Sequence, residues 1–320
     1  MGAEKPDLSR VIPPRAGNED ESMKEIGAST ALYGLIGHPV GHSLSPQIHN
    51  TLAEYTGMDL CYTVFDVESR ERLGDAVRGA HALGIGGLNV TVPYKKDVFP
   101  YLADIDPIAE RIGAVNTLVR CEGGYKGYNT DYMGLRRALE ECGVDVTARD
   151  AAVIGAGGAA RAAVFMYAAA CEDRGAKGRT LFIINRTREK AEALSHEVQE
   201  GFASVNVRVL GLDEAAGIAS MTDGKILAMQ CTSAGLYPDV NSSPITDPGF
   251  FKNVGFAFDA VYKPARTRFM QLAAEQGAGC ANGLSMLLWQ GICAYSLWTG
   301  KDPGPEAVSA VRRKLEDAQR

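Results

Sequence analysis

The sequence lacks the features of disulfide-bonded and nucleic-acid-binding proteins. Its seven cysteines are scattered and form no C-x-x-C pair, which indicates a reducing compartment and thiols that mostly fill the core. Lysine and arginine number 33 against 39 acidic residues, so the net charge is −6, and no basic stripe is present to neutralise phosphates. We therefore expect no nucleic-acid partner.

The sequence also lacks an apolar run of signal-peptide length near its start. Residues 1–29 mix Pro, Gly and charged residues, a composition typical of a disordered tail. Residues 276–300 carry no charge, but Asn282, Ser285 and Gln290 interrupt the segment and no basic cluster flanks it. It therefore predicts a buried helix rather than a membrane span. We expect a cytoplasmic protein without a membrane partner.

The first part of the chain alternates between strand and helix patterns. We predict strands over 32–36, 61–67 and 87–92, helices over 45–57, 70–83 and 97–112, and a hairpin over 114–131 with its turn at 122–124. Ser45 followed by Pro46 is a good N-cap and first-turn pair for the earliest of these helices. The alternation favours an α/β sandwich.

The second part repeats the alternation in a different style. A helix over 132–142 precedes a buried strand, a glycine turn and an alanine-rich helix, and further strands are predicted in "RTLFIINRT", "ILAMQCTS" and "FAFDAVY". Two helices over 283–299 and 304–318 follow without another strand. This pattern is typical of a doubly wound parallel sheet, and 320 residues are enough for two domains.

The glycine turn "VIGAGGAARA" fits the dinucleotide-binding pattern G-x-G-x-x-A. It follows an apolar strand and opens a helix, so glycine backbone can approach a pyrophosphate while the helix N-terminus offers free N–H groups. The alternative is a tight turn without a ligand. The predicted cofactor contacts in this turn are Gly155, Ala156, Gly157, Gly158 and Ala159.

The end of the next strand indicates which dinucleotide binds. An NAD site normally has Asp or Glu there, whereas this chain has Asn185, Arg186 and Thr187, with Lys190 one turn later. The planar guanidinium of Arg186 suits a 2′-phosphate, which favours NADP over NAD. The alternative for Arg186 and Lys190 is a solvated basic helix start.

The stretch "GLNVTVPYKKD" is a strand that ends in polar residues. Taken alone it fits an ordinary strand with a basic turn. Together with other stretches, however, it resembles the shikimate dehydrogenase family. The similar motifs, in the family's order, are "GHSLSP", "NVTVPYK", "GAVNTL", "NTD", "GAGGAARA", "NRT", "FDAVY" and "GLSMLLWQ", and they run from about Leu32 to Gly300.

This resemblance implies a small hydroxylated cyclohexene carboxylate as substrate and a set of site residues. Ser43 and Ser45 would hold the carboxylate, although Ser45 is also explained as a helix cap. Lys95 and Asp131 would relay the proton that accompanies hydride transfer. Further substrate contacts implied by the resemblance are Thr91, Asn116, Tyr262 and Gln290.

The implied fold has two α/β domains with the active cleft between them. A substrate-binding sandwich would comprise 30–131 plus 283–320, and a Rossmann-type NADP domain would comprise 132–282. The expected activity is reversible, NADP-dependent reduction of 3-dehydroshikimate to shikimate, in the pathway to chorismate and the aromatic amino acids. A monomer or a homodimer is expected.

Departures from the family's motifs leave alternatives open. Tyr132 follows "NTD" where glycine is common, and Ser285 also departs from the pattern. "LLWQG" and "LWTGKD" resemble the subgroup that oxidises quinate, often with NAD. A catalytically inactive relative that senses the ligand is a third possibility, which the presence of both Lys95 and Asp131 disfavours.

Other dehydrogenase classes fit the sequence less well. No Tyr-x-x-x-Lys occurs, which disfavours a short-chain dehydrogenase. His38 and His42 are four residues apart, but Pro39 and Gly41 between them rule out a helix face and no cysteine lies nearby. We therefore expect no metal.

Overall fold

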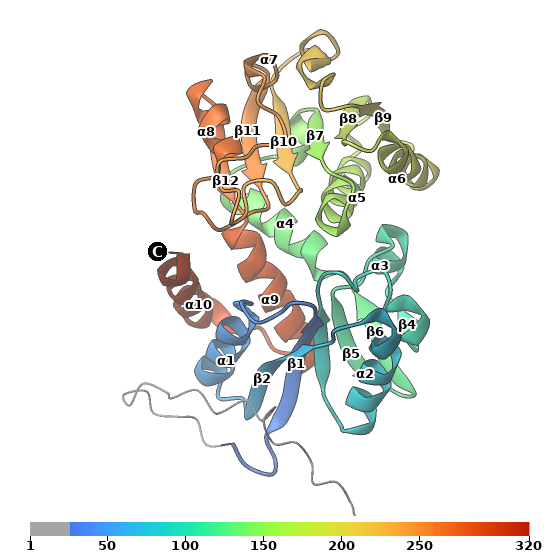
Figure 1. Cartoon of the computed structure of the whole chain (residues 1–320), viewed down its shortest axis with the longest axis vertical. Helices are drawn as coiled ribbons and strands as arrows, with labels where there is room; N and C mark the ends of the chain where they lie inside the picture. Colours follow the sequence, from blue (N-terminus) through green and yellow to red (C-terminus); the bar gives the residue numbers. More distant parts are fainter. Residues whose placement is uncertain (1–25, 320) are drawn as a thin grey trace, which may run out of the picture.

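The computed structural model describes residues 26–319 and contains two lobes, each built on a six-stranded sheet. In Figure 1 the two sheets lie one above the other, with helices α4 and α9 running between them. Most of the predicted disordered tail lies outside the described residues. Residues 27–30 form a turn, and the Thr30 hydroxyl donates to Asp59 Oδ1 at 2.8 Å, so they are tied to the first lobe.

The first lobe has a mixed sheet in the order β2-β1-β3-β5-β6-β4. β1 runs parallel to β2 and β3, whereas β5 runs antiparallel to β3 and β6. The strands are β1 (Ala31–Gly37), β2 (Leu60–Asp66), β3 (Gly87–Val90), β4 (Asp104–Ile105), β5 (Thr117–Cys121) and β6 (Gly124–Tyr128). The predicted hairpin is confirmed as β5 and β6.

Helices cover both faces of this first sheet. On one face, buried apolar residues come from α1 (Ser45–Thr56), α9 (Leu284–Thr299) and α10 (Gly304–Gln319). On the other face lie α2 (Arg70–Ala82) and α3 (Pro107–Ile112). The first lobe is therefore an α/β sandwich that needs the C-terminal helices for one of its layers.

The second lobe is a doubly wound parallel sheet in the order β12-β11-β10-β7-β8-β9. The order reverses between β7 and β10, and open α/β sheets bind ligands at such a switch point. The strands are β7 (Ala151–Ile154), β8 (Arg179–Ile184), β9 (Val205–Leu210), β10 (Ile226–Gln230), β11 (Val254–Asp259) and β12 (Gly279–Asn282). The helices are α4 (Thr130–Glu141), α5 (Gly158–Asp173), α6 (Arg188–Gly201), α7 (Pro248–Phe251) and α8 (Arg268–Glu275).

Two helical predictions need correction. Residues 97–112 are not one helix, because the segment contains a short 3-10 turn (Phe99–Tyr101), β4 and then α3. The Asp106 carboxylate accepts from the Ile108 N–H at 3.0 Å and Pro107 opens the helix, so α3 starts late. Within 276–300, β12 comes first and the helix begins only at Leu284.

The lobes are joined where α4 and α9 cross. A side-chain Cβ on Gly134 would lie 2.7 Å from the Met286 carbonyl oxygen and 2.8 Å from the Gln290 backbone nitrogen. Only glycine at this position therefore lets α4 and α9 approach so closely. The chain passes from one lobe to the other through α4 and returns at Gly283. The domain boundaries predicted from the sequence lie at these crossings and stay a prediction.

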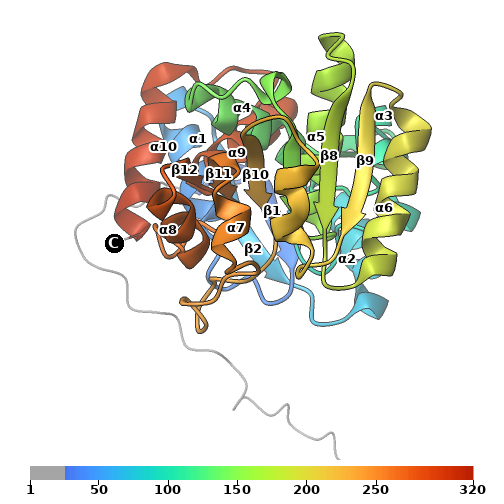
Figure 2. The ribbon, with the colours of Figure 1, turned by 90° about the horizontal axis from the view of Figure 1, so that it is seen from above.

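A second connection between the lobes lies where α3 faces α5 and α6. In both Figure 1 and Figure 2, α3 and α6 lie on the same side of the molecule. Arg111 donates to the Gly201 carbonyl at 2.7 Å, and the nearly buried Arg161 donates to the Ile112 carbonyl and pairs with Glu197. Within residues 26–319, no helix has the length and apolar character needed to cross a bilayer.

Candidate active site

The centre of the candidate site is an ion pair between Lys95 and Asp131. Lys95 lies in the turn after β3, and Asp131 lies in the first turn of α4. Lys95 Nζ is 2.6 Å from Asp131 Oδ2, and the two side chains are 20% and 10% exposed. The pair is thus partly shielded from water but still accessible, as proton transfer to a ligand requires.

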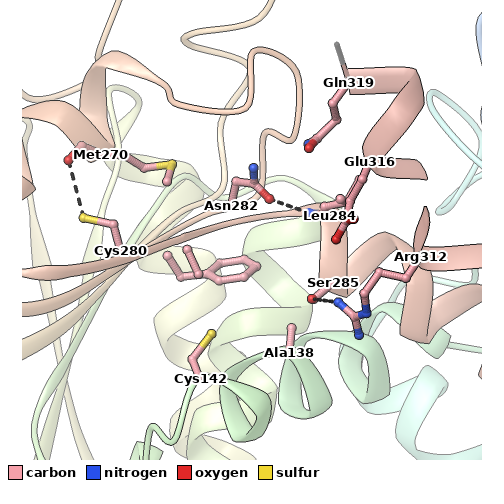
Figure 3. Close-up of a pocket in the computed structure, with 12 residues that line it drawn as sticks. Ala138, Cys142, Met270, Cys280, Asn282, Leu284, Ser285, Arg312, Glu316 and Gln319 are labelled. Atoms are coloured by element: carbon pink, nitrogen blue, oxygen red, sulfur yellow. Dashed lines mark hydrogen bonds between the residues drawn. The ribbon is translucent and has the colours of Figure 1, made fainter. Parts of the chain in front are cut away.

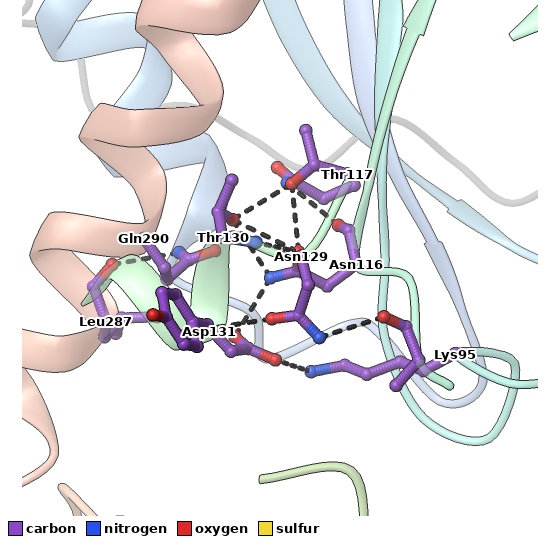
Figure 4. A network of polar contacts seen from close by, with 11 residues as sticks. Lys95, Asn116, Thr117, Asn129, Thr130, Asp131, Leu287 and Gln290 are labelled. Atoms are coloured by element: carbon purple, nitrogen blue, oxygen red, sulfur yellow. Dashed lines mark hydrogen bonds and ion pairs between the residues drawn. The ribbon is translucent and has the colours of Figure 1, made fainter. Parts of the chain in front are cut away.

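Local sequence fixes Asp131 at the start of α4. Asn129 caps this helix, since its Oδ1 accepts from the Tyr132 N–H at 3.1 Å, and its Nδ2 donates to the Ala114 carbonyl at 2.9 Å. Asn116 Nδ2 donates to Asp131 Oδ1 at 2.9 Å. Both carboxylate oxygens of Asp131 therefore have a donor, one from Lys95 and one from Asn116 (Figure 4).

Asn116 is itself held by its neighbours. Its Oδ1 accepts from the Thr130 N–H at 2.7 Å and from the Thr117 hydroxyl at 3.2 Å. Asn116, Thr117 and Thr130 are all buried. The structure therefore brings three of the predicted site residues, Lys95, Asp131 and Asn116, into one hydrogen-bonded group.

The loop before α1 contains the two predicted serines. Ser43 Oγ is 3.1 Å from Ser45 Oγ and accepts from the Ser45 N–H at 3.2 Å, so the serines form a local pair. The prediction that Ser45 is the N-cap is wrong, because Leu44 is the cap and Ser45 is already helical and buried. Its hydroxyl lies beside buried Tyr62, whose pKa is raised well above its usual value by burial.

The remaining predicted substrate contacts lie on separate elements. Thr91 directly follows β3, and its methyl group packs where a Cβ on Gly37 would be. Gln290 is buried on α9 and donates to the Leu287 carbonyl at 2.9 Å, close to the start of α4 (Figure 4). Tyr262 follows β11, is half-buried, and packs against the first lobe's apolar cluster. No described contact joins these three side chains to Lys95.

The glycine turn lies at the end of β7, on the switch-point side of its sheet. Gly155 has φ of 118°, and a Cβ there would lie 3.2 Å from the Cys231 carbonyl oxygen, so the position requires glycine. A Cβ on Gly157 would meet nothing within 4 Å, and a Cβ on Gly158 would lie 3.5 Å from Lys95 Cδ. The α5 N-terminus therefore lies beside the Lys95–Asp131 pair.

The residues predicted to select the cofactor lie one strand away. β7 and β8 are parallel neighbours with Ile154 opposite Ile184, so Gly155 and Asn185 follow at adjacent strand ends. Asn185 Nδ2 donates to the Thr187 carbonyl at 2.7 Å, and Arg186 and Lys190 are exposed at the start of α6. A dinucleotide fits here, because open backbone at Gly157, helix N–H groups and exposed cations suit its phosphates.

Asn89, in the motif "NVTVPYK", uses its side-chain amide inside the first lobe. Its Oδ1 accepts from the Tyr62 hydroxyl and its Nδ2 donates to the Thr117 hydroxyl. Thr117, Asn129 and Thr130 were not singled out, although "NTD" contains a good helix cap in Asn129.

A separate cavity of about 340 Å³ lies at the other side of the α4–α9 crossing. Figure 3 shows side chains from α4, β12, α9 and α10 around it, including Cys142, Asn282 and Arg312. Arg312 donates to the Ser285 hydroxyl at 2.9 Å and to Glu141 at 2.7 Å. None of the predicted site residues lines this cavity, so it is distinct from the Lys95–Asp131 region.

Comparison with known proteins gives matches in both lobes. A family model described as the shikimate dehydrogenase substrate binding domain matches residues 35–118. A second model, described as the shikimate 5′-dehydrogenase C-terminal domain, matches residues 283–314.

Individual relatives match almost the whole chain. The shikimate dehydrogenase (NADP(+)) of Moorella thermoacetica is 41% identical over 298 residues, covering 92% of this chain and 97% of that relative. A shikimate dehydrogenase crystallised with NADP+ has a TM-score of 0.81 at 38% identity, with 92% and 98% covered. The shikimate 5-dehydrogenase of Listeria monocytogenes, solved with shikimate and NAD, also has a TM-score of 0.81, at 32% identity with 92% and 99% covered.

Proposed function

The chain belongs to the shikimate dehydrogenase family, and from this premise we propose that it catalyses the reversible, NADP-dependent reduction of 3-dehydroshikimate to shikimate. The observation that carries the proposal is the 2.6 Å pair of Lys95 and Asp131, placed beside the dinucleotide turn at Gly158. An acid–base group and a hydride carrier's binding turn are thereby adjacent, which is what carbonyl reduction needs.

Lys95 is the proton donor in the reduction and the acceptor in the reverse reaction. Its side chain lies beside the α5 N-terminus at Gly158, and Asp131 orients the ammonium group and stabilises its charge. Asn116 holds Asp131 through the opposite carboxylate oxygen. When bound, NADP supplies or accepts the hydride at its nicotinamide ring.

The substrate's other groups are assigned to polar side chains of the first lobe and its C-terminal helices. Ser43 and Ser45 bind the carboxylate, for which a pair of hydroxyls 3.1 Å apart at the start of α1 is suited. Thr91, Asn116, Gln290 and Tyr262 contact the ring hydroxyls and its edge. These roles follow the family's motifs, and only Asn116 has a described hydrogen bond to the catalytic pair.

The second lobe would hold the cofactor. Gly155, Ala156, Gly157, Gly158 and Ala159 would bind the pyrophosphate through backbone at the α5 N-terminus. Asn185, Arg186, Thr187 and Lys190 would surround the adenosine ribose, and the exposed cations Arg186 and Lys190 would bind its 2′-phosphate. Absence of an acidic residue at the end of β8 supports NADP over NAD.

Two other uses of the same fold remain to be separated by experiment. Quinate oxidation with NAD is one, and binding without catalysis is the other, which the assembled Lys95–Asp131 pair disfavours. Absorbance of reduced nicotinamide is followed with shikimate or quinate, each with NADP or NAD. Turnover only in the pairing of shikimate with NADP supports the proposal. Turnover of quinate with NAD would instead indicate a quinate dehydrogenase. Shikimate binding without turnover in any pairing would indicate a sensor.

The cellular setting follows from the activity and is part of the proposal. The reaction would serve the route to chorismate and the aromatic amino acids. A cytoplasmic location and a monomer or homodimer stay predictions.

A further inference from the structure

A buried series of hydrogen bonds runs from the interior of the first lobe to the catalytic pair. The Tyr62 hydroxyl donates to Asn89 Oδ1 at 2.7 Å, and Asn89 Nδ2 donates to Thr117 Oγ1 at 3.1 Å. Thr117 Oγ1 donates to Asn116 Oδ1 at 3.2 Å, and Asn116 Nδ2 donates to Asp131 Oδ1 at 2.9 Å. Each link passes from donor to acceptor in one direction, ending at the carboxylate that binds Lys95.

The side chains of this series are almost completely removed from water. Tyr62 is 2% exposed, Asn89 4%, Thr117 0% and Asn116 3%, so water cannot replace a lost partner. In such a site an unpaired polar group is costly and each hydrogen bond restricts the orientation of the next group.

The direction of the series follows from the chemistry of its members. The Tyr62 hydroxyl has a single proton, which it donates to Asn89 Oδ1. Because Oδ1 faces Tyr62, the Asn89 amide nitrogen faces Thr117. Thr117 then accepts from Asn89, so its own proton is directed to Asn116 Oδ1 or to the Thr130 hydroxyl, which is 3.0 Å away. Asn116 Oδ1 also accepts from the Thr130 N–H at 2.7 Å, and the Asn116 nitrogen therefore points at Asp131.

Packing holds Tyr62 in the required place. His49, which is fully buried, stacks on the Tyr62 ring with centroids 4.3 Å apart and planes at 22°. Burial lowers the pKa of His49 to about 3, so the imidazole is neutral. Ser45 also lies next to the Tyr62 hydroxyl, which connects the proposed carboxylate-binding end of the site to the same series.

We propose that Tyr62 is a positioning residue for the reaction: through Asn89, Thr117 and Asn116 it sets the orientation of Asp131, and hence of the Lys95 ammonium. This inference rests on the proposed function, because its kinetic consequence concerns proton transfer by Lys95. Tyr62 is 2% exposed and is joined to Asp131 through the series, so its loss is expected to reduce turnover rather than cofactor binding.

The kinetic test compares two buried tyrosines of the first lobe. Tyr125 is 0% exposed and its hydroxyl donates to the Ile85 carbonyl at 2.8 Å, outside the series. Tyr62→Phe is expected to lower kcat about tenfold with KM for NADP unchanged, the order of effect of one buried hydrogen bond on a transition state. Tyr125→Phe, which also loses one buried hydrogen bond, leaves kcat near wild type. Equal kcat values for the two variants would overturn the proposal.

A second set of variants tests whether the links act as one unit. Thr117→Val removes the hydroxyl while keeping the shape of the side chain, and Thr117→Ser restores it. We expect Thr117→Val to lower kcat and Thr117→Ser to recover it. Tyr62→Phe and Thr117→Val combined should cost little more than either alone, because they interrupt the same series. Full additivity of the two effects would show that they act independently.

A measurement without substrate separates this proposal from the function on which it rests. The Asn116 side-chain amide protons are observed by NMR in the full chain, and their exchange with solvent is timed. Faster exchange in Tyr62→Phe, with no change in Tyr125→Phe, supports the series even if wild type fails to oxidise shikimate. Unchanged exchange in both variants would refute the series while leaving a shikimate–NADP turnover result intact.

Discussion

The two halves of the candidate site are built in opposite ways. In the first lobe, Lys95, Asp131 and Asn116 are joined to one another by hydrogen bonds. In the second lobe, Arg186 and Lys190 are exposed at the start of α6. Proton transfer depends on fixed geometry, whereas a phosphate can be bound by cations that are open to solvent. The residues proposed for proton transfer are thus held by mutual hydrogen bonds, and those proposed for the 2′-phosphate are exposed.

The largest expected effect comes from breaking the assembled half. Lys95→Met keeps most of the side-chain stem but removes the ammonium group, and kcat should fall by about 100-fold or more, as for loss of an acid–base group. Initial rates with shikimate and NADP measure it, while a binding assay reports whether shikimate affinity persists. Lys96→Met is the control, because Lys96 is the adjacent, exposed lysine without a bond to Asp131. A similar fall in both variants would remove Lys95 from its role.

An intermediate effect is expected at a buried carboxylate that has no ion-pair partner among residues 26–319. Asp259 accepts from the Thr267 hydroxyl at 2.6 Å and from the Val261 N–H at 2.9 Å. Burial raises the pKa of Asp259 to about 6, so the folded protein holds this proton more tightly than the unfolded chain does. Its stabilising contribution is complete below about pH 4 and is lost as the pH rises through 6, a change of about 2–3 kcal/mol.

Unfolding by denaturant at pH 4 to 7 tests this prediction in Asp259→Asn. Asparagine cannot ionise, so the stability of the variant relative to wild type should increase across that window. Asp247→Asn, at an exposed helix cap in the same lobe, should show no such trend. A constant difference for Asp259→Asn would mean that the carboxyl titrates normally. The result would sharpen the contrast with Asp131, whose buried carboxylate has a lysine partner.

The smallest effect is expected at the open half. Arg186→Ala should raise KM for NADP about tenfold and leave KM for NAD nearly unchanged, because only NADP carries the 2′-phosphate. Arg188→Ala is the matched control, since Arg188 is already paired with Glu214 at 2.7 Å. Steady-state kinetics with both cofactors gives the comparison. Equal changes in KM for the two cofactors would contradict the proposed role of Arg186.

The same contrast explains what the sequence could predict. The glycine turn and the ends of β7 and β8 are formed by residues that are close together in the sequence. Short sequence patterns were therefore enough to predict these cofactor-site residues. The pairing of Lys95 with Asp131 joins residues 36 positions apart through the strand order β3-β5-β6, and no local pattern encodes it. That pairing was expected only from the resemblance to a family.

The errors have a similar origin. β12 is a four-residue strand at the edge of its sheet, so its residues are only partly buried or exposed and show little periodicity. Ser45 looked like a helix cap because capping residues are read locally, whereas burial against Tyr62 is a tertiary property. Arg161 lies in an alanine-rich helix, and no sequence pattern predicted that it would donate to the Ile112 carbonyl of the other lobe.

The shared apolar cluster of the first lobe has a consequence for biosynthesis. Tyr33 and Leu35 of β1 pack in it with Leu288 of α9 and Leu315 of α10, which lie more than 250 positions later in the chain. At roughly 5–20 residues per second, β1 waits about fifteen seconds to a minute on the ribosome for these partners. The second lobe draws its strands from one uninterrupted stretch and can form meanwhile. The lobe whose strands emerge first is therefore completed after the second lobe, and until α9 and α10 arrive only α1 covers this face of its sheet.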